Sequence, residues 1–272
     1  MLLIFLIILI IFVIIYCLCK KDKFSLKTIN AYISTSPRPL DDNECQKSIE
    51  NLIYKIHEIL PYSKIIIVCD GINKDKISNK NIENYYKKIY NLKLMQQNTI
   101  FKNKLFIDKY EDFLHEAEAL RRSMKKHPSD YIFSTQDDLD IMISKKECNN
   151  ILTYLEYNDI DYIRLNWHNN NNLKGKNDER LPYTKHDKIN DLKKSYFWSC
   201  RPHFATMKHY ENKVWKLCKS NIKKSREQQL LPFSTKDKNW KIWIYAPKYN
   251  LQNEKHNKCG DVPTKTVRIN GH

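Results

Sequence analysis

Apolar residues recur along this chain in two patterns: every second residue, as in a strand, or every three to four residues, as in a helix. The order of these patterns along the chain predicts an α/β fold. Residues 28–34 alternate as a strand does, and residues 41–60 then carry apolar side chains at helical spacing up to Pro61. Residues 63–69 form the strongest strand signal, a nearly continuous apolar run. A strand, a helix and a strand within about 40 residues predict a βαβ unit with two parallel strands.

The same alternation continues through the rest of the chain. Residues 111–126 predict a helix with an acidic start and a basic end, as the helix dipole favours, and residues 131–135 predict a buried strand. No internal repeat is visible, nor a second core large enough for a separate domain. Further expected elements are helices within 74–95 and at 144–156 and 209–223, strands within 99–108 and at 161–167 and 240–246, and a polar loop at 168–194.

The predicted strand at 131–135 is followed by Gln136 and then by three carboxylates within four positions, Asp137, Asp138 and Asp140. Carboxylates this close repel one another unless a cation or hydrogen bonds offset the repulsion. Mg²⁺ typically lies between one or two carboxylates and the phosphates of a substrate, so the segment suggests a metal–diphosphate site. On these residues alone, a solvated acidic turn that caps the next helix is an equal alternative.

Composition narrows the choice of partner. The net charge of +16 indicates an anionic partner, such as a nucleotide, a nucleic acid or an anionic membrane surface. Lysine is abundant throughout, so the charge is not specific evidence for nucleic acid. With only four glycines, the chain has no Walker or dinucleotide fingerprint. The eight cysteines form no C-x-x-C pair or zinc pattern, and as reduced, buried thiols they weakly favour a reducing compartment.

Residues 1–19 carry no charged side chain and consist mostly of Leu, Ile, Phe and Val. As a helix they would span about 28 Å, close to the roughly 30 Å hydrocarbon core of a bilayer. A basic n-region and a small-residue cleavage site are both absent, which argues against a cleaved signal peptide. We expect a single-pass anchor at 1–19, a stem at 20–27 and one domain at 28–272. The lysines directly after the anchor favour a cytosolic domain.

Polar residues follow three predicted strands at the point where each ends. They are Thr35 to Arg38, Asp70 with Gly71, and Gln136 to Asp140. The carboxyl ends of parallel strands share one edge of a sheet, where open α/β sheets bind ligands. We therefore expect a nucleotide across these strand ends. Asp70 would accept hydrogen bonds from a base or ribose, and the later carboxylates would hold a cation on the diphosphate.

In this order and spacing, residues 28–143 resemble the glycosyltransferases of the GT-A fold, most closely the family 2 type. The matching segments are Thr35 to Pro39, Ile65 to Gly71, Glu116 to Arg122 and Phe133 to Asp138. The resemblance implies a Rossmann-like, mixed and mostly parallel sheet flanked by helices. It also implies a nucleotide-sugar half at 28–143 and an acceptor half at 144–272, which matches more loosely.

The resemblance further implies a metal site for Mn²⁺ or Mg²⁺. In the family, an Asp-x-Asp motif follows the central strand, and its last Asp binds the cation on the diphosphate. By position Asp138 takes that role, with Gln136 in place of the first Asp and Asp137 between them, near the ribose and diphosphate. Asp138-Leu139-Asp140 satisfies the same spacing, so Asp140 is a second candidate ligand. His256 resembles the late His that completes the metal shell in some members.

The remaining implied roles concern the donor and the acceptor. Thr35 and Arg38 would flank the nucleotide of a UDP- or GDP-sugar, and Asp70 would lie by its base. An inverting reaction also needs a carboxylate base for the hydroxyl of a glycan, protein or lipid acceptor. Glu227 is the candidate, against the alternative of an ordinary solvated helix glutamate. The aromatic segment 196–207 suits either sugar rings or core packing.

Two other readings remain open. A nucleotidyltransferase would also use a carboxylate pair and a metal, although the loop 35–39 has no glycine to cradle phosphates. A non-catalytic, membrane-tethered module would hold an anionic polymer through basic charge and interleaved aromatic residues. A nuclease is disfavoured because no second carboxylate set is spaced for a two-metal site, and no specific nucleic-acid partner is expected.

Overall fold

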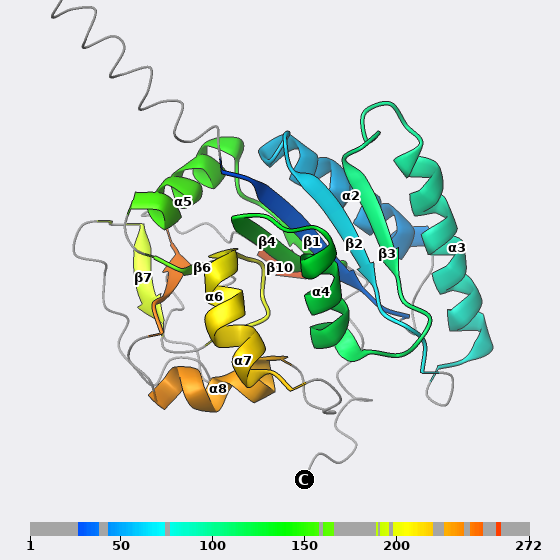
Figure 1. Cartoon of the computed structure of the whole chain (residues 1–272). Coiled ribbons are helices and arrows are strands. Elements are labelled where there is room, and N and C mark those ends of the chain that lie inside the picture. Colours follow the sequence, from blue (N-terminus) through cyan, green and yellow to red (C-terminus); the bar gives the residue numbers. More distant parts are fainter. Residues whose placement is uncertain are drawn as a thin grey trace, which may run out of the picture.

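A central sheet with helices on both faces organises the chain (Figure 1). This computed structural model describes residues 27–37, 43–73, 77–157, 160–165, 189, 191–195, 198–219, 226–236, 240–246 and 254–256. Within these residues the main sheet has the strand order β3-β2-β1-β4-β8-β6-β9-β7, and β10 and β5 form a separate pair. The fold is thus α/β, as the periods of the sequence predict, with the mixed, Rossmann-like sheet that the resemblance implies.

The first half of the chain builds four neighbouring parallel strands. Ile33 at the centre of β1 lies opposite Ile67 of β2 on one side and Thr135 of β4 on the other, and β3 extends the sheet beyond β2. The predicted βαβ unit is therefore confirmed. The elements are β1 (Ile29–Thr35), α2 (Asn43–Ile59), β2 (Lys64–Cys69), α3 (Asn79–Gln96), β3 (Leu105–Lys109), α4 (His115–Lys126) and β4 (Tyr131–Gln136).

The second half extends the same sheet with mixed direction. β8 is antiparallel to both β4 and β6, β9 is parallel to β6, and β7 closes this edge in antiparallel pairing with β9. The elements are β5 (Leu139–Ile141), α5 (Lys145–Tyr157), β6 (Tyr162–Leu165), β7 (Leu192–Ser195), β8 (His203–Thr206), α6 (Met207–His209), the π-helical turn η2 (Tyr210–Val214), α7 (Trp215–Leu217), α8 (Arg226–Lys236), β9 (Ile242–Tyr245) and β10 (Glu254–His256).

Several elements of this half differ from the expected ones. The helix expected at 209–223 covers only residues 207–217 and contains a π-helical turn. The short strands β5, β7, β8 and β10 were not predicted, because three or four residues are too few to show a period, and β7 begins within the segment 168–194 that was expected to be a loop. Helix α8 was not predicted either, and it contains Pro232, a residue that usually ends a helix.

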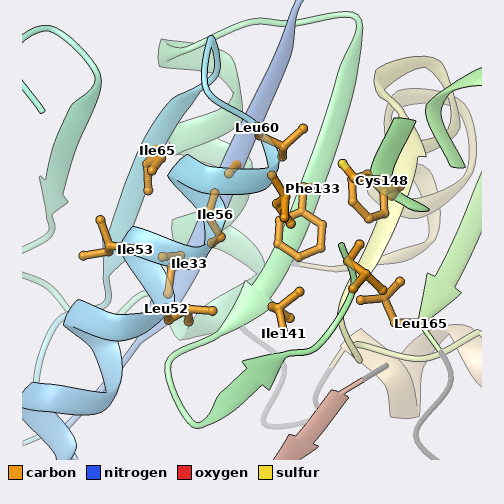
Figure 2. Packing of buried hydrophobic residues seen from close by; sticks show 14 of the residues in the cluster. Ile33, Leu52, Ile53, Ile56, Leu60, Ile65, Phe133, Ile141, Cys148 and Leu165 are labelled. Atoms are coloured by element: carbon orange, nitrogen blue, oxygen red, sulfur yellow. The ribbon is translucent and has the colours of Figure 1, made fainter. Parts of the chain in front are cut away.

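Alternate residues of the strands bury their side chains on opposite faces of the sheet. On one face Ile33 and Phe133 pack with side chains from α2, α3 and α5 (Figure 2). On the other face Tyr32 and Ile132 pack with side chains from α4, η2 and α8. Both clusters contain strand residues from the two halves of the chain, so one sheet joins the two halves.

The described residues bear on two expectations, the membrane anchor and the reduced cysteines. No helix among them is long and apolar enough to cross a membrane, and the predicted anchor at 1–19 lies outside them. The cysteines whose side chains are described, Cys69, Cys148, Cys200 and Cys218, are buried free thiols, as expected.

Candidate nucleotide-binding site

A pocket of about 140 Å³ lies at the carboxyl ends of β1, β2 and β4, on the face covered by α4. The chain places β2 and β3 on one side of β1 and β4 on the other, so its winding reverses between β1 and β4. Open α/β sheets bind ligands at such a switch point. The pocket brings together three predicted residues, Thr35, Asp70 and Gln136. Its full lining is Ser34, Thr35, Ser36, Val68, Asp70, Glu116, Ala119 and Gln136.

Asp70 is held in place by two backbone amides. Its Oδ1 accepts hydrogen bonds from the amides of Gly71, at 2.8 Å, and Leu114, at 2.9 Å. Burial raises the pKa of this carboxyl above its usual value, while the two amide hydrogen bonds act in the opposite direction. Between described residues no hydrogen bond ends on Oδ2, so a fixed carboxylate presents one oxygen to a ligand.

Gly71 is required by packing. A Cβ at this position would lie 2.0 Å from the carbonyl oxygen of Asp112, which no side chain tolerates. Without that atom, the loop before α4 passes close to the end of β2 and delivers the Leu114 amide to Asp70. The Asp-Gly pair, predicted as a turn, therefore also sets the pocket wall.

Asp137 takes part in a buried ion pair. Its Oδ2 accepts hydrogen bonds from the hydroxyl of Thr35 and from Nζ of Lys88, the latter at 3.1 Å. The side chains of Lys88 and Asp137 are only 4% and 5% exposed. The ammonium group of Lys88 thus compensates the negative charge of Asp137, which would otherwise be buried after β4 without a counter-charge. Nothing in the polar sequence of α3 singles out Lys88 among its neighbouring lysines.

The proposed metal ligands lie in the turn after β4 and in the small sheet. Asp138 is buried in the turn, and Asp140 lies half-buried in β5. The backbone of His256 in β10 lies opposite Leu139, the residue between these two aspartates. Among the described side chains, no three His, Cys, Asp or Glu residues gather into a metal site. Carboxylate oxygens and imidazole nitrogens are the kinds of donor that a divalent cation takes, and the β5–β10 pairing brings the backbone of His256 alongside the segment that follows Asp138.

Glu116 of α4 joins the two halves of the chain at the pocket. Its Oε1 accepts hydrogen bonds from Gln136, at 3.4 Å, and from Nη2 of Arg226, at 2.6 Å. Arg226 is fully buried at the start of α8, and its Nη1 donates to the hydroxyl of Tyr210 at 3.2 Å. Burial opposes the charge of the guanidinium, but Glu116 together with Cys200 and Tyr210 outweighs it, and the pKa of Arg226 lies well above its usual value.

The sequence offered only a weak signal for this ion pair. Glu116 belongs to the segment that carries the family resemblance, but Arg226 stands in an ordinary polar stretch. Nothing in the sequence indicates that two residues 110 positions apart meet. The contact depends on how α8 folds back across the face of the sheet.

None of the described residues expected on the acceptor side lines the pocket. The side chain of Glu227 is exposed on the first turn of α8, beside Arg226, and does not line the pocket. Trp198 and His203 are fully buried, so the aromatic segment serves core packing. Arg38 lies outside the described residues.

Neither a protein-family model nor a curated protein sequence matches this chain. Solved structures do. TarS 1–349 of S. aureus is 12% identical with a TM-score of 0.48, over 81% of this chain and 58% of that chain. A UDP-glucose pyrophosphorylase complexed with UDP-glucose is 13% identical with a TM-score of 0.47, over 86% of this chain and 95% of that chain.

A third match is the mannosyltransferase PcManGT from Pyrobaculum calidifontis in complex with GDP-Man and Mn²⁺. It is 9% identical with a TM-score of 0.44, over 68% of this chain and 46% of that chain. This chain therefore spans less than two thirds of both TarS 1–349 and PcManGT. Matches at this level carry no argument about the reaction, which rests on the pocket itself.

Proposed function

We propose that this protein is a GT-A type glycosyltransferase that moves a sugar from a nucleotide-sugar donor to a glycan, protein or lipid acceptor. The observation that carries the proposal is the pocket at the switch point, where Thr35, Asp70 and Gln136 meet. The aspartate turn begins directly after Gln136. A nucleoside diphosphate needs hydrogen-bond acceptors for its base and ribose and a cation for its phosphates; Asp70 would supply an acceptor, and the aspartate turn would hold the cation.

On the donor side, Asp70 would accept hydrogen bonds from the base or ribose. Its carboxylate is already oriented by two amides, so little freedom is lost when the nucleotide binds. Asp138, Asp140 and His256 would hold Mn²⁺ or Mg²⁺. When bound, the cation supplies Lewis-acid stabilisation of the charge that develops on the departing nucleoside diphosphate.

On the acceptor side, Glu227 is the proposed base for the acceptor hydroxyl. Its neighbour Arg226 is paired with Glu116 of the pocket wall at 2.6 Å, which places the first turn of α8 beside the pocket. An exposed carboxylate at this point is available to an acceptor that approaches the bound donor. The apolar segment 1–19 would anchor the enzyme in a membrane, with the domain on the cytosolic side.

Calorimetry of the full chain with UDP- and GDP-sugars, with and without Mn²⁺, tests the proposal. We expect binding that needs the metal and that Asp138→Asn abolishes. Glu227→Gln should retain donor binding and lose transfer, and Asp140→Asn shows which aspartate is the principal ligand. Donor binding that ignores both a chelator and Asp138→Asn would contradict the proposal.

The same preparation distinguishes the reaction from nucleotidyl transfer. A glycosyltransferase releases a nucleoside diphosphate or monophosphate from a nucleotide-sugar. A nucleotidyltransferase releases pyrophosphate from a nucleoside triphosphate in the presence of a sugar phosphate. Pyrophosphate release that depends on Asp138 would show that the protein is a nucleotidyltransferase and not a glycosyltransferase.

A further inference from the structure

A second surface lies at the opposite edge of the sheet from the pocket, where the parallel strands begin. Tyr62 is 97% exposed in the turn before β2, and Ile100 is 48% exposed in the turn after α3. Single exposed apolar side chains are normal, but several that gather on one surface indicate an interaction site. We call the following residues the basal surface: Tyr54, Tyr62, Tyr90, Leu94 and Ile100.

Contacts between the supporting segments make the basal surface continuous. The ring of Tyr54 packs edge-on against Phe101, with centroids 5.2 Å apart, which joins α2 to the turn after α3. Nζ of Lys104 donates to the carbonyl of Pro61 at 3.0 Å, which joins that turn to the turn before β2. Tyr90 and Leu94 are four residues apart near the end of α3, and so lie on one side of the helix.

Lysines accompany these apolar side chains. Lys64, Lys93, Lys102 and Lys125 are exposed on the same segments or at the neighbouring end of α4. Of the exposed carboxylates nearby, Glu58 pairs with Lys55 at 3.0 Å, whereas Asp130, which accepts a hydrogen bond from the Thr28 amide, keeps its negative charge and is outnumbered by the four lysines. The basal surface therefore has a positive charge around an aromatic and aliphatic centre. This combination suits the headgroup region of an anionic bilayer, where tyrosine and lysine have both an apolar and a polar environment.

The chain also begins its fold at this edge. Thr28 is bonded to Asp130 at 2.8 Å, and β1 starts at Ile29, at the same end of the sheet as the turn between α3 and β3 (Figure 1). Only residues 20–27 separate that point from the apolar segment 1–19. Eight residues span at most about 28 Å, so a bilayer that holds residues 1–19 lies within about that distance of Thr28, the residue before β1.

We propose that the basal surface docks on anionic lipid headgroups. The tyrosines, Leu94 and Ile100 would enter the interface, and the lysines would pair with lipid phosphates. The six residues of β2 then separate the bilayer from the pocket by about 20 Å. The pocket faces away from the membrane, and an acceptor reaches it from the aqueous side. The route by which an acceptor reaches the pocket rests on the proposed transferase activity, whereas the docking itself does not.

Hydrogen–deuterium exchange of the full chain in nanodiscs tests this docking. We expect amides in residues 60–64 and 97–104 to exchange roughly fivefold more slowly on discs with phosphatidylserine than on pure phosphatidylcholine. A fivefold change in the docking equilibrium corresponds to about 1 kcal/mol, the contribution of one lysine near an anionic surface. The double variant Tyr62→Ser/Ile100→Ser should lose the protection. The matched variant Met142→Ser/Phe233→Ser, at two exposed apolar residues outside the basal surface, should keep it.

Equal exchange on the two lipids would overturn the proposal. Protection that needs no anionic lipid and grows with protein concentration would also overturn it, because it would indicate a second copy of this chain as the partner. If the chain does not enter the discs, flotation with preformed phosphatidylserine vesicles decides, and failure to float at low salt has the same consequence. None of these readouts requires sugar transfer.

Discussion

Two histidines of the second half lie in the core as neutral rings. Burial lowers the pKa of both His203 and His209 to about 3. His203 is bonded to the hydroxyl of Tyr210 at 2.6 Å, whereas neither ring nitrogen of His209 has a partner among the described residues. The His209 ring instead packs edge-on against Trp240, with centroids 5.7 Å apart. Folding therefore requires both rings to be neutral.

This requirement gives the protein an acid-sensitive stability. The unfolded chain protonates each ring near its ordinary pKa of 6.5, so the stability is fully present above pH 6.5 and is lost as the pH falls towards 3. In that range each histidine lowers the free energy of unfolding by up to ~1.4 kcal/mol for every unit by which the pH falls. We expect His209→Phe, which keeps the packing and removes the titration, to show a shallower loss in urea unfolding between pH 6.5 and 5.

The exposed residue Asn212, three positions along the same helical segment, supplies the control. Asn212→Gln should retain the pH dependence of the unaltered chain, since it neither titrates nor packs in the core. An unchanged slope in His209→Phe would show that His209 is not the group that makes the fold acid-sensitive.

Among the elements, α8 contacts the first half of the chain through core packing of Leu230 and through an ion pair with α4. Glu116 of α4 and Arg226 of α8 meet at 2.6 Å, with Arg226 1% exposed and Glu116 29% exposed. Removal of one partner of a buried pair leaves the other charge uncompensated, which costs far more than removal of both. The pair also connects the pocket wall to the helix that carries Glu227, so its geometry bears on the acceptor side.

We predict that Glu116→Gln lowers the free energy of unfolding by about 3 kcal/mol, because the Arg226 cation stays buried without its counter-charge. The double variant Glu116→Gln/Arg226→Met should recover part of this loss. Glu58→Gln, in the exposed pair with Lys55, is the control and should change stability by less than about 1 kcal/mol. Urea unfolding measures all three, and equal losses for Glu58→Gln and Glu116→Gln would contradict the prediction.

At the scale of the whole molecule, one sheet carries both halves of the chain. β4 of the first half pairs with β8 of the second, with Phe133 opposite Phe204. The two rings lie 4.6 Å apart in the core, and each face of the sheet buries side chains from both halves. The halves share a core and should unfold together, in agreement with the absence of a second core in the sequence.

The positions of the tryptophans make this testable. All five lie at residue 167 or later, so tryptophan fluorescence reports the second half, whereas far-UV circular dichroism reports the entire chain. We expect the two signals to give the same midpoint in urea, as a single cooperative unit requires. A fluorescence transition that precedes the loss of secondary structure would show that the second half unfolds independently.

Much of the candidate site was predictable because its residues follow strand ends. Thr35, Asp70 and Gln136 each come directly after or at the end of an apolar run, and parallel strands bring such positions to one edge. Lys88, Glu116 and Arg226 were missed. They lie in helices, where a charged residue is usually a solvated one, and only packing shows that they are buried or paired.

By itself, the sequence determined the parallel βαβ core, the order of strand and helix in the first half, and the polar strand ends at the pocket. These features depend on local periods and on the rule that parallel strands share one edge. Only the tertiary structure decided the features that join distant segments: the β5–β10 pairing that brings His256 opposite Leu139, and the ion pair that brings Arg226 to Glu116. Such contacts depend on how short, weakly patterned elements fold back onto the sheet. Local hydrophobic periodicity does not predict these long-range arrangements.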